Sequence, residues 1–528
     1  MVTRRTLLKA AGAAPLLLKG APARAQDGGS STLRLVPQGD LAVLDPIWTT
    51  AGITQTHGYH VFDTLYSPDS TFTPQPQAAE SHTVSDDGLT WEFTLRNGLT
   101  FHDGEPVRAK DVAASITRWS KRDVYGKLLD ALVADWDTSD DAVIRLQLTG
   151  PFPNLLDALS RPSAPFIMPE RIAQTDPNES ITEIIGSGPY RFLADEYNPG
   201  SLVAYERFAE YAPRSEPADW LSGGKQAFFD RVEWHIIPDA ATVASALAAN
   251  EVDWWQFTAP DLNPLLENNP DITLENTDPY GFFSFLRFNS GIPPFNNAAI
   301  KRAVVSAIDQ TQFLSAVAGA NASNSQVCLS FFPCGLPYVE QLGAEFIATP
   351  PDLEKARAAV AEAGYAGETV VILNPTDIPT FKPLAEIGAA LLQSLGFTVD
   401  LQAMDWGTVV ERRAVTAPVE EGGWSIFPTD GPAAGFANPV ANPTIRGLGA
   451  DGWAGAYSNP EEEALIAEWV AADTEEERQR VFTAIHESLW QDPPNAPVGQ
   501  YFVQTAYRSD LTGRVVYPFP LPWGIRRS

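Results

Sequence analysis

The first third of the chain contains two segments in which apolar and polar residues alternate. Residues 91–96 (WEFTLR) and 143–148 (VIRLQL) have the two-residue period of a strand with one buried face. Turn-forming pairs adjoin both segments, including Asn97-Gly98 and Gly150-Pro151. We therefore predict strands there, a further short strand at 32–36, a turn-rich region from there to about residue 80, and a helix at 109–119.

From about residue 230 the pattern changes to strands that alternate with helices. The expected strands cover residues 232–238, 252–257, 280–289, 369–374, 397–404 and 498–507. The expected helical segments cover residues 242–250, 261–268, 297–318, 352–364, 379–395, 460–471 and 475–491. Such alternation favours an α/β fold with mixed sheets. A chain of 528 residues exceeds what one hydrophobic core holds, so we expect at least two lobes.

The first 25 residues are typical of a signal peptide. Arg4 and Arg5 precede a short apolar run, and Ala23-Arg24-Ala25 forms a small-residue cleavage site. The paired arginines indicate the twin-arginine export route, with cleavage after about Ala25. No cysteine lies near that site, so we expect no lipid anchor. No later stretch approaches 18 uninterrupted apolar residues, so we expect no membrane span. The periplasm is the expected compartment.

The net charge of the chain limits the kinds of partner that we expect. The formal net charge is −30, and loss of five basic residues with the signal would bring it to −35. Such a charge repels nucleic acid and anionic membrane surfaces and gives cationic ligands a mild preference.

The only two cysteines, Cys328 and Cys334, lie six residues apart. In an oxidising compartment a disulfide is favoured over free thiols or a pair of metal ligands.

Several segments, in order, resemble the peptide and nickel family of binding proteins that serve ABC importers. The match runs through almost the whole chain after the signal and includes LDP (44–46), VFDTLY (61–66), residues 85–119, GSGPYRF (186–192), and residues 228–253, 295–320, 352–365 and 395–406. The resemblance implies a two-lobed periplasmic binding protein fold with an enlarged first lobe. Two crossing strands, within 280–289 and 498–503, would form the hinge.

The same resemblance implies how the chain divides into lobes. The large first lobe would hold residues 32–283, with an inserted subdomain at about 71–185, and the return segment 497–528. The small lobe would hold residues 284–496.

The resemblance also indicates where the ligand lies. On the first lobe the match points to Thr50 and Gly52, with Trp48 beside them. On the second it points to Trp424 and to Asp430, whose carboxylate would accept a ligand's ammonium group. The usual Asp-Pro pair of relatives reads Asn438-Pro439 here, which puts that ammonium pocket, and a free peptide as ligand, in question.

Two further groups of residues have alternative interpretations. Trp255, or its neighbour Trp254, could cover one face of a ligand, although one of two adjacent strand residues usually lies in the core. His57 and His60 have the spacing of a metal pair, but with no third ligand in view we expect ordinary structural histidines and no metal.

The sequence favours a binding protein over an enzyme. No HExxH, G-x-S-x-G or cysteine–histidine nucleophile pattern is present, so an exported hydrolase is disfavoured and no cofactor is expected. The expected partners are a small peptide-like solute, a permease pair and its ATPases, with the protein acting as a monomer. An opine, an oligosaccharide or a nickel complex as ligand, and a sensor or chaperone role, stay open.

Overall fold

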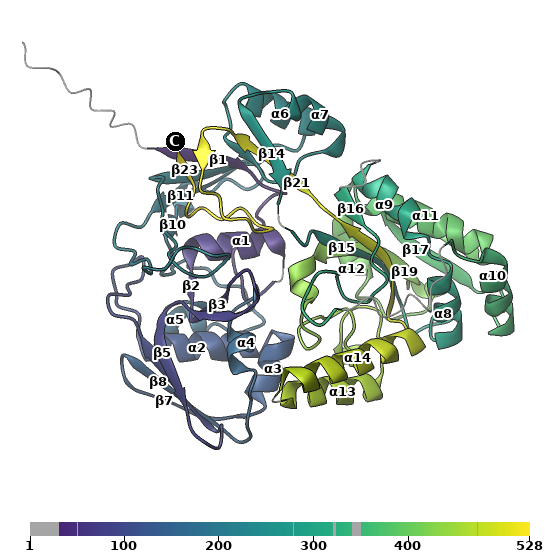
Figure 1. Cartoon of the computed structure of the whole chain (residues 1–528), viewed down its shortest axis with the longest axis horizontal. Coiled ribbons are helices and arrows are strands. Elements are labelled where there is room, and N and C mark those ends of the chain that lie inside the picture. Colours follow the sequence, from purple (N-terminus) through teal and green to yellow (C-terminus); the bar gives the residue numbers. More distant parts are fainter. Residues whose placement is uncertain (1–30, 50, 278, 320–323, 340–349, 473) are drawn as a thin grey trace, which may run out of the picture.

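The molecule is built on two large mixed β-sheets (Figure 1). The computed structural model describes residues 31–528 except residues 50, 278, 320–323, 340–349 and 473. The expected signal segment therefore lies almost wholly outside the described residues. No helix among the described residues is both long and apolar enough to cross a membrane.

The first sheet has seven strands and defines what we call the first lobe. Its order is β10 (Tyr190–Phe192), β11 (Leu202–Arg207), β12 (Arg231–His235), β1 (Thr32–Val36), β13 (Trp254–Trp255), β21 (Gln504–Arg508) and β14 (Ile272–Asn276). Strand β1 runs parallel to both of its neighbours, whereas the other pairs are antiparallel. The sheet is therefore mixed, as the alternating pattern predicts. Helices α6 (Ala240–Ala248) and α7 (Asn263–Glu267) belong to this lobe.

The second sheet has six strands and defines the second lobe. Its order is β16 (Ser325–Gln326), β20 (Asn495–Tyr501), β15 (Phe282–Phe288), β19 (Ile426–Pro432), β17 (Thr369–Pro375) and β18 (Thr398–Met404). Its helices are α8 (Ala298–Ser306), α9 (Gln310–Ala318), α10 (Leu353–Glu362), α11 (Phe381–Ser394), α12 (Trp406–Arg412), α13 (Pro460–Ala471) and α14 (Glu475–Gln491). Helices α13 and α14 have the predicted bounds.

The chain passes between the two sheets twice, between the end of β14 and the start of β15 and again at Phe502–Val503. The predicted strand 498–507 is wrong as a single element, because β20 ends at Tyr501 in one sheet and β21 begins at Gln504 in the other. The predicted hinge segments 280–289 and 498–503 include crossing residues at one end, whereas β15 and β20 themselves lie within the second sheet. The two crossing segments lie together, since the Thr277 amide donates to the Val503 carbonyl over 2.9 Å.

A smaller antiparallel sheet extends the first lobe. Its order is β5 (Ala79–Val84), β6 (Thr90–Leu95), β8 (Val143–Leu148) and β7 (Val133–Asp140). Helix α2 (Ala109–Ser120) follows β6, and β6 and β8 confirm the two alternating strands predicted from the sequence. The remaining elements of this lobe are α1 (Gly52–Val61), β2 (Asp63–Thr64), β3 (Tyr66–Pro68), β4 (Pro74–Pro76), α3 (Val124–Asp130), α4 (Leu155–Leu159), β9 (Phe166–Ile167), α5 (Glu170–Ala173), β22 (Leu511–Thr512) and β23 (Arg526–Arg527).

The segment predicted as helical over 297–318 contains two helices. The side chain of Asp309 accepts a hydrogen bond from the Thr311 amide over 3.0 Å and so starts α9 anew. Helix α1 lies within the region that we expected to be rich in turns. Its hydrophobic face is weakly defined, because its buried residues include Gln55, Thr56 and His57.

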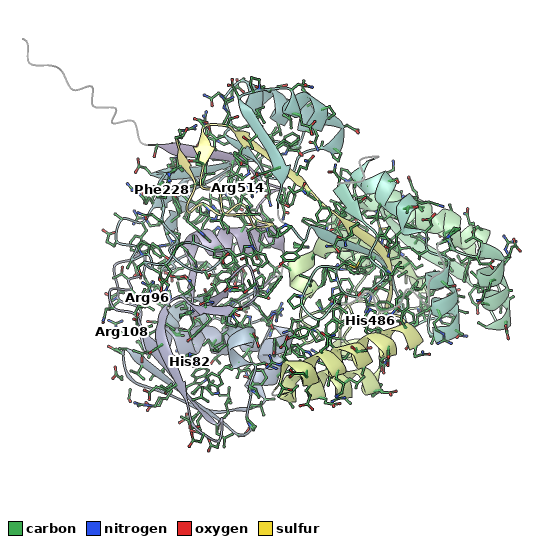
Figure 2. All side chains as sticks on the ribbon, in the orientation of Figure 1. His82, Arg96, Arg108, Phe228, His486 and Arg514 are labelled. Carbon is green, nitrogen blue, oxygen red and sulfur yellow. A yellow bond between two sulfur atoms is a disulfide. The ribbon has the colours of Figure 1, made fainter. Side chains whose placement is uncertain are left out.

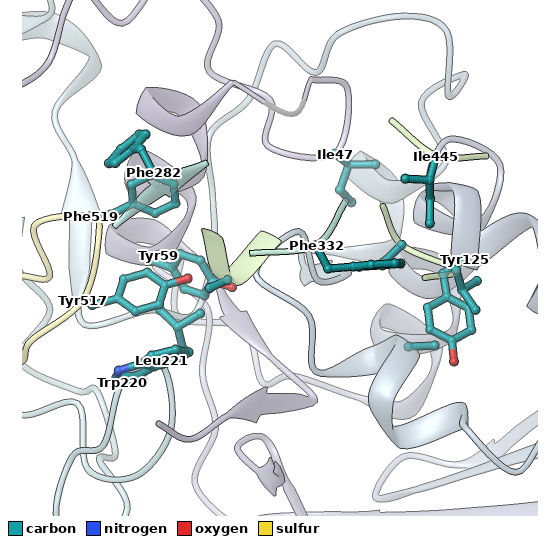
Figure 3. Close-up of a cluster of buried hydrophobic side chains, with 14 of the residues drawn as sticks. Ile47, Tyr59, Tyr125, Trp220, Leu221, Phe282, Phe332, Ile445, Tyr517 and Phe519 are labelled. Carbon is teal, nitrogen blue, oxygen red and sulfur yellow. The ribbon is translucent and has the colours of Figure 1, made fainter. Parts of the chain in front are cut away.

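Aromatic side chains from distant parts of the sequence pack the first lobe onto its C-terminal segment. Tyr59 from α1, Trp220, Leu221, Tyr517 and Phe519 lie close together in Figure 3. The rings of Trp220 and Tyr517 are 5.3 Å apart, and those of Tyr517 and Phe519 5.7 Å. The last residues of the chain therefore form part of the first lobe's core.

Cys328 and Cys334 form a disulfide in the second lobe. Both sulfurs are buried and pack against Phe283 and Phe285 of β15. The bridge closes a short loop next to the central strand of the second sheet.

Candidate functional site

A large cavity lies where the two lobes face each other. Its volume is about 1900 Å³, and its lining comes from both sheets and from the helices around them. Pockets for drug-sized ligands measure roughly 300–1,000 Å³, so this larger space admits a ligand of several residues together with water. A solute held here would contact both lobes at once.

Two of the predicted first-lobe residues line the cavity. Gly52 is the first residue of α1, and a Cβ atom there would lie 3.0 Å from the Phe519 ring and 3.1 Å from Gln38. Trp255 lines the cavity from β13, while its neighbour Trp254 points into the core and donates from Nε1 to Thr505 Oγ1 over 2.7 Å. Each of the paired tryptophans thus faces a different side of the strand.

The other two predicted first-lobe residues are not placed in the site. Trp48 is 36 % exposed but does not line the cavity, and its indole donates to the Asn178 carbonyl over 3.2 Å. Thr50 lies outside the described residues. Its neighbours Thr49 and Ala51 line the cavity, so the segment that follows the LDP motif (44–46) does form part of the cavity wall.

Asp430 is an acidic group on the second-lobe wall whose side chain has one hydrogen bond among the described residues. It lies on β19 opposite Ser284 of β15, and its Oδ2 accepts a hydrogen bond from the Tyr501 hydroxyl over 2.5 Å. Burial raises the pKa of Asp430 to about 7, and the Tyr501 hydrogen bond opposes that rise. A carboxyl group with one neutral donor and little water is suited to accept a cation from a ligand.

Trp424 lies outside the cavity. Its side chain is fully buried with Val371, Leu373, Val409 and Phe427, and its Nε1 donates to the Arg413 carbonyl over 3.2 Å. The tryptophan that matches the family's marker is therefore part of the second lobe's core. Asn438, the residue in place of the usual aspartate, does line the cavity.

Sequence reasoning missed a charged group of the cavity, Arg413, which follows the last residue of α12. Trp406, Val410 and Arg413 are spaced i, i+4 and i+7, so they share one helix face, and all three line the cavity. Asp405 starts this helix by accepting from the Thr408 amide over 3.0 Å. The helical spacing in WGTVVERR was the sequence signal that could have found Arg413.

The histidines do not form a metal site. Burial lowers the pKa of both His57 and His60 to about 3, so both are neutral. His57 bonds to the Tyr205 hydroxyl and His60 to the Thr56 carbonyl, each over 2.9 Å. His82 and His486 lie in different lobes (Figure 2). Within the described part of the chain, no three His, Cys, Asp or Glu residues are arranged to hold a metal ion.

Sequence comparison gives one family and several relatives. Residues 73–442 match the model of the bacterial extracellular solute-binding proteins, family 5 Middle. The chain is 37 % identical to a probable peptide ABC transporter periplasmic-binding protein of Sinorhizobium fredii, with all of both chains covered. It is 26 % identical to a glutathione-binding protein of Pectobacterium atrosepticum, over 90 % of each.

Solved structures of similar fold agree with this assignment. The ABC transporter-associated periplasmic binding protein DppA from Helicobacter pylori, in complex with the peptide STSA, has a TM-score of 0.78 at 20 % identity, with 94 % of this chain and 98 % of that one covered. The binding protein AgaA from A. tumefaciens R10, in complex with agropinic acid, has a TM-score of 0.75 at 20 % identity, with 94 % and 99 % covered. The fold is thus the two-lobed fold of periplasmic binding proteins, and the chain belongs to the bacterial extracellular solute-binding proteins of family 5.

Proposed function

We propose that this protein is the periplasmic solute-capturing subunit of an ABC importer and that it binds peptides or peptide-like solutes. The observation that carries the proposal is Asp430, a sparsely bonded carboxyl group in a large cavity between two lobes. It is suited to accept a ligand ammonium group, which peptides and amino-acid derivatives share. Gly52 and Trp255 would contact the same ligand from the first lobe.

The mechanism that follows is closure of the lobes over the solute. The lobes are joined through two short segments, and both lobes contribute residues to the cavity walls. A ligand that touches both walls only in the closed form shifts the population toward that form in proportion to its differential affinity. The closed form would then dock on a permease pair whose ATPases drive uptake.

Several finer features belong to the same proposal. The expected lobe boundaries at residues 283 and 497 would shift slightly, because β15 begins at Phe282 and β20 ends at Tyr501 in the second sheet. Export by the twin-arginine route and cleavage after about Ala25 would deliver a monomer that catalyses no reaction. Relatives named for peptides and for glutathione support the ligand class, since both carry an α-ammonium and carboxylates.

Thermal melting of the exported form tests this proposal. The protein is first denatured and refolded to remove any ligand from the host, and then melted with di- and tripeptides, glutathione, opines, oligosaccharides and nickel–histidine. A ligand that binds the native state raises the melting temperature as its concentration rises. We expect a rise with peptides or glutathione. A rise with sugars alone would overturn the assignment of the ligand class, and no rise with any compound would favour a role other than solute capture.

A further inference from the structure

Asp157 on α4 is a carboxyl group of the cavity wall without a partner in the described part of the chain. It lines the cavity and is half-buried, yet its side chain has no hydrogen bond or ion pair with any residue that the structure describes. An aspartate at the third position of a helix often accepts from the amide of the residue before the helix, but the side chain of Asp157 does not bond to Asn154. A partly buried carboxylate is normally paired, so Asp157 is suited to a partner that the ligand supplies.

Asp157 differs in this respect from the other acids of the cavity. Each of the others, among the described residues, accepts a hydrogen bond from a donor of the chain. These donors are the Gly200 amide for Asp40, Arg161 for Asp123, the Tyr501 hydroxyl for Asp430 and the Tyr338 hydroxyl for Glu475. The unpaired carboxylate is thus a property of position 157 and not of the acids of the cavity in general.

The side chain of Asp157 lies on the face of α4 that is turned toward the second lobe. Asn154 lies three residues earlier on the same face, and it bonds to α13 and α14 across the lobes. Burial raises the pKa of Asp157, and the charge of Arg478 on α14 opposes that rise. Arg478 nevertheless forms no ion pair with Asp157, because its Nη2 and Nε donate to Asn154 and to the Ala472 carbonyl. The carboxylate therefore faces the cavity and not a bonded arginine.

An indole on the opposite wall also lacks a partner. Trp469 of α13 lines the cavity and is 4 % exposed, and its Nε1 has no acceptor among the residues that the structure describes. Its ring centroid lies 5.9 Å from the Cζ of Arg478, the arginine whose charge reaches Asp157. An acceptor from the first lobe and a donor from the second thus border the same end of the cavity, where α4 lies beside α13 and α14 (Figure 1). We call this end, bordered by Asp157, Trp469 and Arg478, the α4 pocket.

We propose that the α4 pocket selects peptides with a basic side chain, whose cationic group binds Asp157 while the Trp469 indole donates to a carbonyl of the same peptide. A lysine or arginine side chain brings several donors to a carboxylate that has none, and such bonds are stronger than those between neutral groups. The net charge of −30 also favours a cationic solute. This inference rests on the proposed function and deepens it: the peptide would carry an ammonium group for Asp430 and a basic side chain for Asp157.

The first test compares alanine tripeptides that carry lysine or norleucine at the second or at the third position. Norleucine has the hydrocarbon side chain of lysine without the ammonium group. Wild type should bind the lysine peptide about 10- to 100-fold more tightly than its norleucine counterpart at one of these positions, because charged hydrogen bonds are gained. Asp157→Asn keeps the shape of the side chain and should remove that preference. Asp195→Asn, the same change at an exposed aspartate of the first lobe, should preserve it. Isothermal titration calorimetry measures all of these affinities.

The second test needs no peptide. Protein labelled with ¹⁵N-tryptophan is titrated with butylammonium chloride, and with sodium chloride at the same ionic strength, while the indole resonances are followed by NMR. The Trp469 resonance is assigned by its absence in Trp469→Phe. We expect it to shift saturably with butylammonium in wild type, and not in Asp157→Asn. A Trp469 resonance that stays in place, or that shifts equally in both proteins, overturns the α4 pocket as a cation site.

The outcomes separate the two proposals. If wild type binds the lysine and norleucine peptides equally well at both positions, the selection of basic side chains is wrong although solute capture stands. If Asp157→Asn keeps the full preference for lysine, the assignment of that preference to Asp157 is wrong. If no peptide binds while butylammonium still shifts the Trp469 resonance through Asp157, the peptide ligand is wrong and the cation site stands. A melting temperature of ligand-free Asp157→Asn within a few degrees of wild type shows that the variant is folded.

Discussion

Burial raises the pKa of Asp430 to about 7, far above the ordinary value of an aspartate, so this carboxyl group changes charge near neutral pH. The folded protein therefore holds a proton that the unfolded chain has already released between about pH 4 and pH 7. Stability attributable to this group falls as the pH rises through that window, since the fold favours the neutral form. The affinity for a cationic ligand should change in the opposite direction and rise with pH, because the ligand's positive charge pairs with the ionised carboxylate of Asp430.

We predict that Asp430→Asn separates these two effects. At pH 8 the variant should be more stable than wild type by roughly 1 kcal/mol or more, because it removes a poorly solvated charge. The gain should shrink toward pH 4, where the wild-type carboxyl group is protonated in the folded state and about half protonated in the unfolded chain. Urea unfolding of both proteins at pH 4, 6 and 8 measures this. A variant less stable than wild type at pH 8 would contradict the raised pKa.

The same residue gives a prediction for binding. Wild type should lose affinity for an ammonium-bearing ligand by up to about tenfold per pH unit below pH 7, as Asp430 takes up its proton. Asp430→Asn should bind that ligand about 10- to 100-fold more weakly at pH 8, with little pH dependence. Isothermal titration calorimetry at several pH values measures both. An equal pH dependence in the two proteins would remove Asp430 from the site.

At the scale of elements, the crossing segment before β15 depends on Gly281. Its φ is +66°, and a Cβ atom there would lie 2.3 Å from the Tyr501 carbonyl oxygen of β20. Both the left-handed backbone and the close approach of the neighbouring strand therefore require glycine.

We predict that Gly281→Ala destabilises the protein by about 2–4 kcal/mol, because the strain of a positive φ and the clash of the new Cβ with the Tyr501 carbonyl oxygen add. Gly98→Ala is the matched control: φ is +79° there, but no atom lies within 4 Å of the added Cβ. That variant should cost only about 1 kcal/mol. Chemical unfolding of both measures the difference, and equal losses would show that the approach of Tyr501 is relieved by a small shift.

The disulfide loop gives a second element-scale prediction. Cys328 and Cys334 close a loop with a sequence separation of six. Replacing both by serine should lower the unfolding free energy by about 2 kcal/mol from loop entropy, with a further loss because serine hydroxyls would replace buried sulfurs. Replacing both by alanine is the control that omits the hydroxyls. If the double-alanine variant unfolds with the same denaturant midpoint as wild type, the disulfide contributes little to stability.

Elements with a strong period could be predicted from the sequence, and elements decided by tertiary contacts could not. The helices at 460–471 and 475–491 have clear caps, so their bounds were predictable. By contrast, the break between β20 and β21 arises because the chain changes from one sheet to the other. No residue pattern within 498–507 signals that change. Strand β19 was missed because it contains two prolines, Pro428 and Pro432.

The candidate site shows the same division. Asp430 was found through its family position, and the structure places it on the cavity wall. Trp424 matched its marker equally well but is core, because matching reports position along the chain and not the direction of a side chain. Arg413 was missed because the shared helix face of Trp406, Val410 and Arg413 was not considered at the sequence level, although its spacing was visible there.

At the scale of the whole molecule, the lobes also touch away from the crossing segments. Asn154, just before α4 of the first lobe, donates to the Val470 carbonyl of α13 over 2.9 Å. It accepts from Arg478 of α14 over 2.6 Å. Helices α3 and α4 lie beside α13 and α14 in Figure 1, at the end of the molecule opposite the crossing segments. These two hydrogen bonds join the lobes at that end.

We predict that Asn154→Ala favours the open form, because it removes two hydrogen bonds between the lobes. Each such bond contributes about 1 kcal/mol, so the closed form should lose about 5- to 30-fold in population relative to the open form. The radius of gyration from small-angle X-ray scattering should rise without ligand and return to the wild-type value at saturating ligand. Asn268→Ala, which removes a bond to Pro264 within the first lobe, is the control and should leave the radius unchanged. If Asn154→Ala also left it unchanged, the crossing segments and the cavity walls alone would set the angle between the lobes. In that case ligand affinity should be unaltered too, since the same closed population would be available to bind.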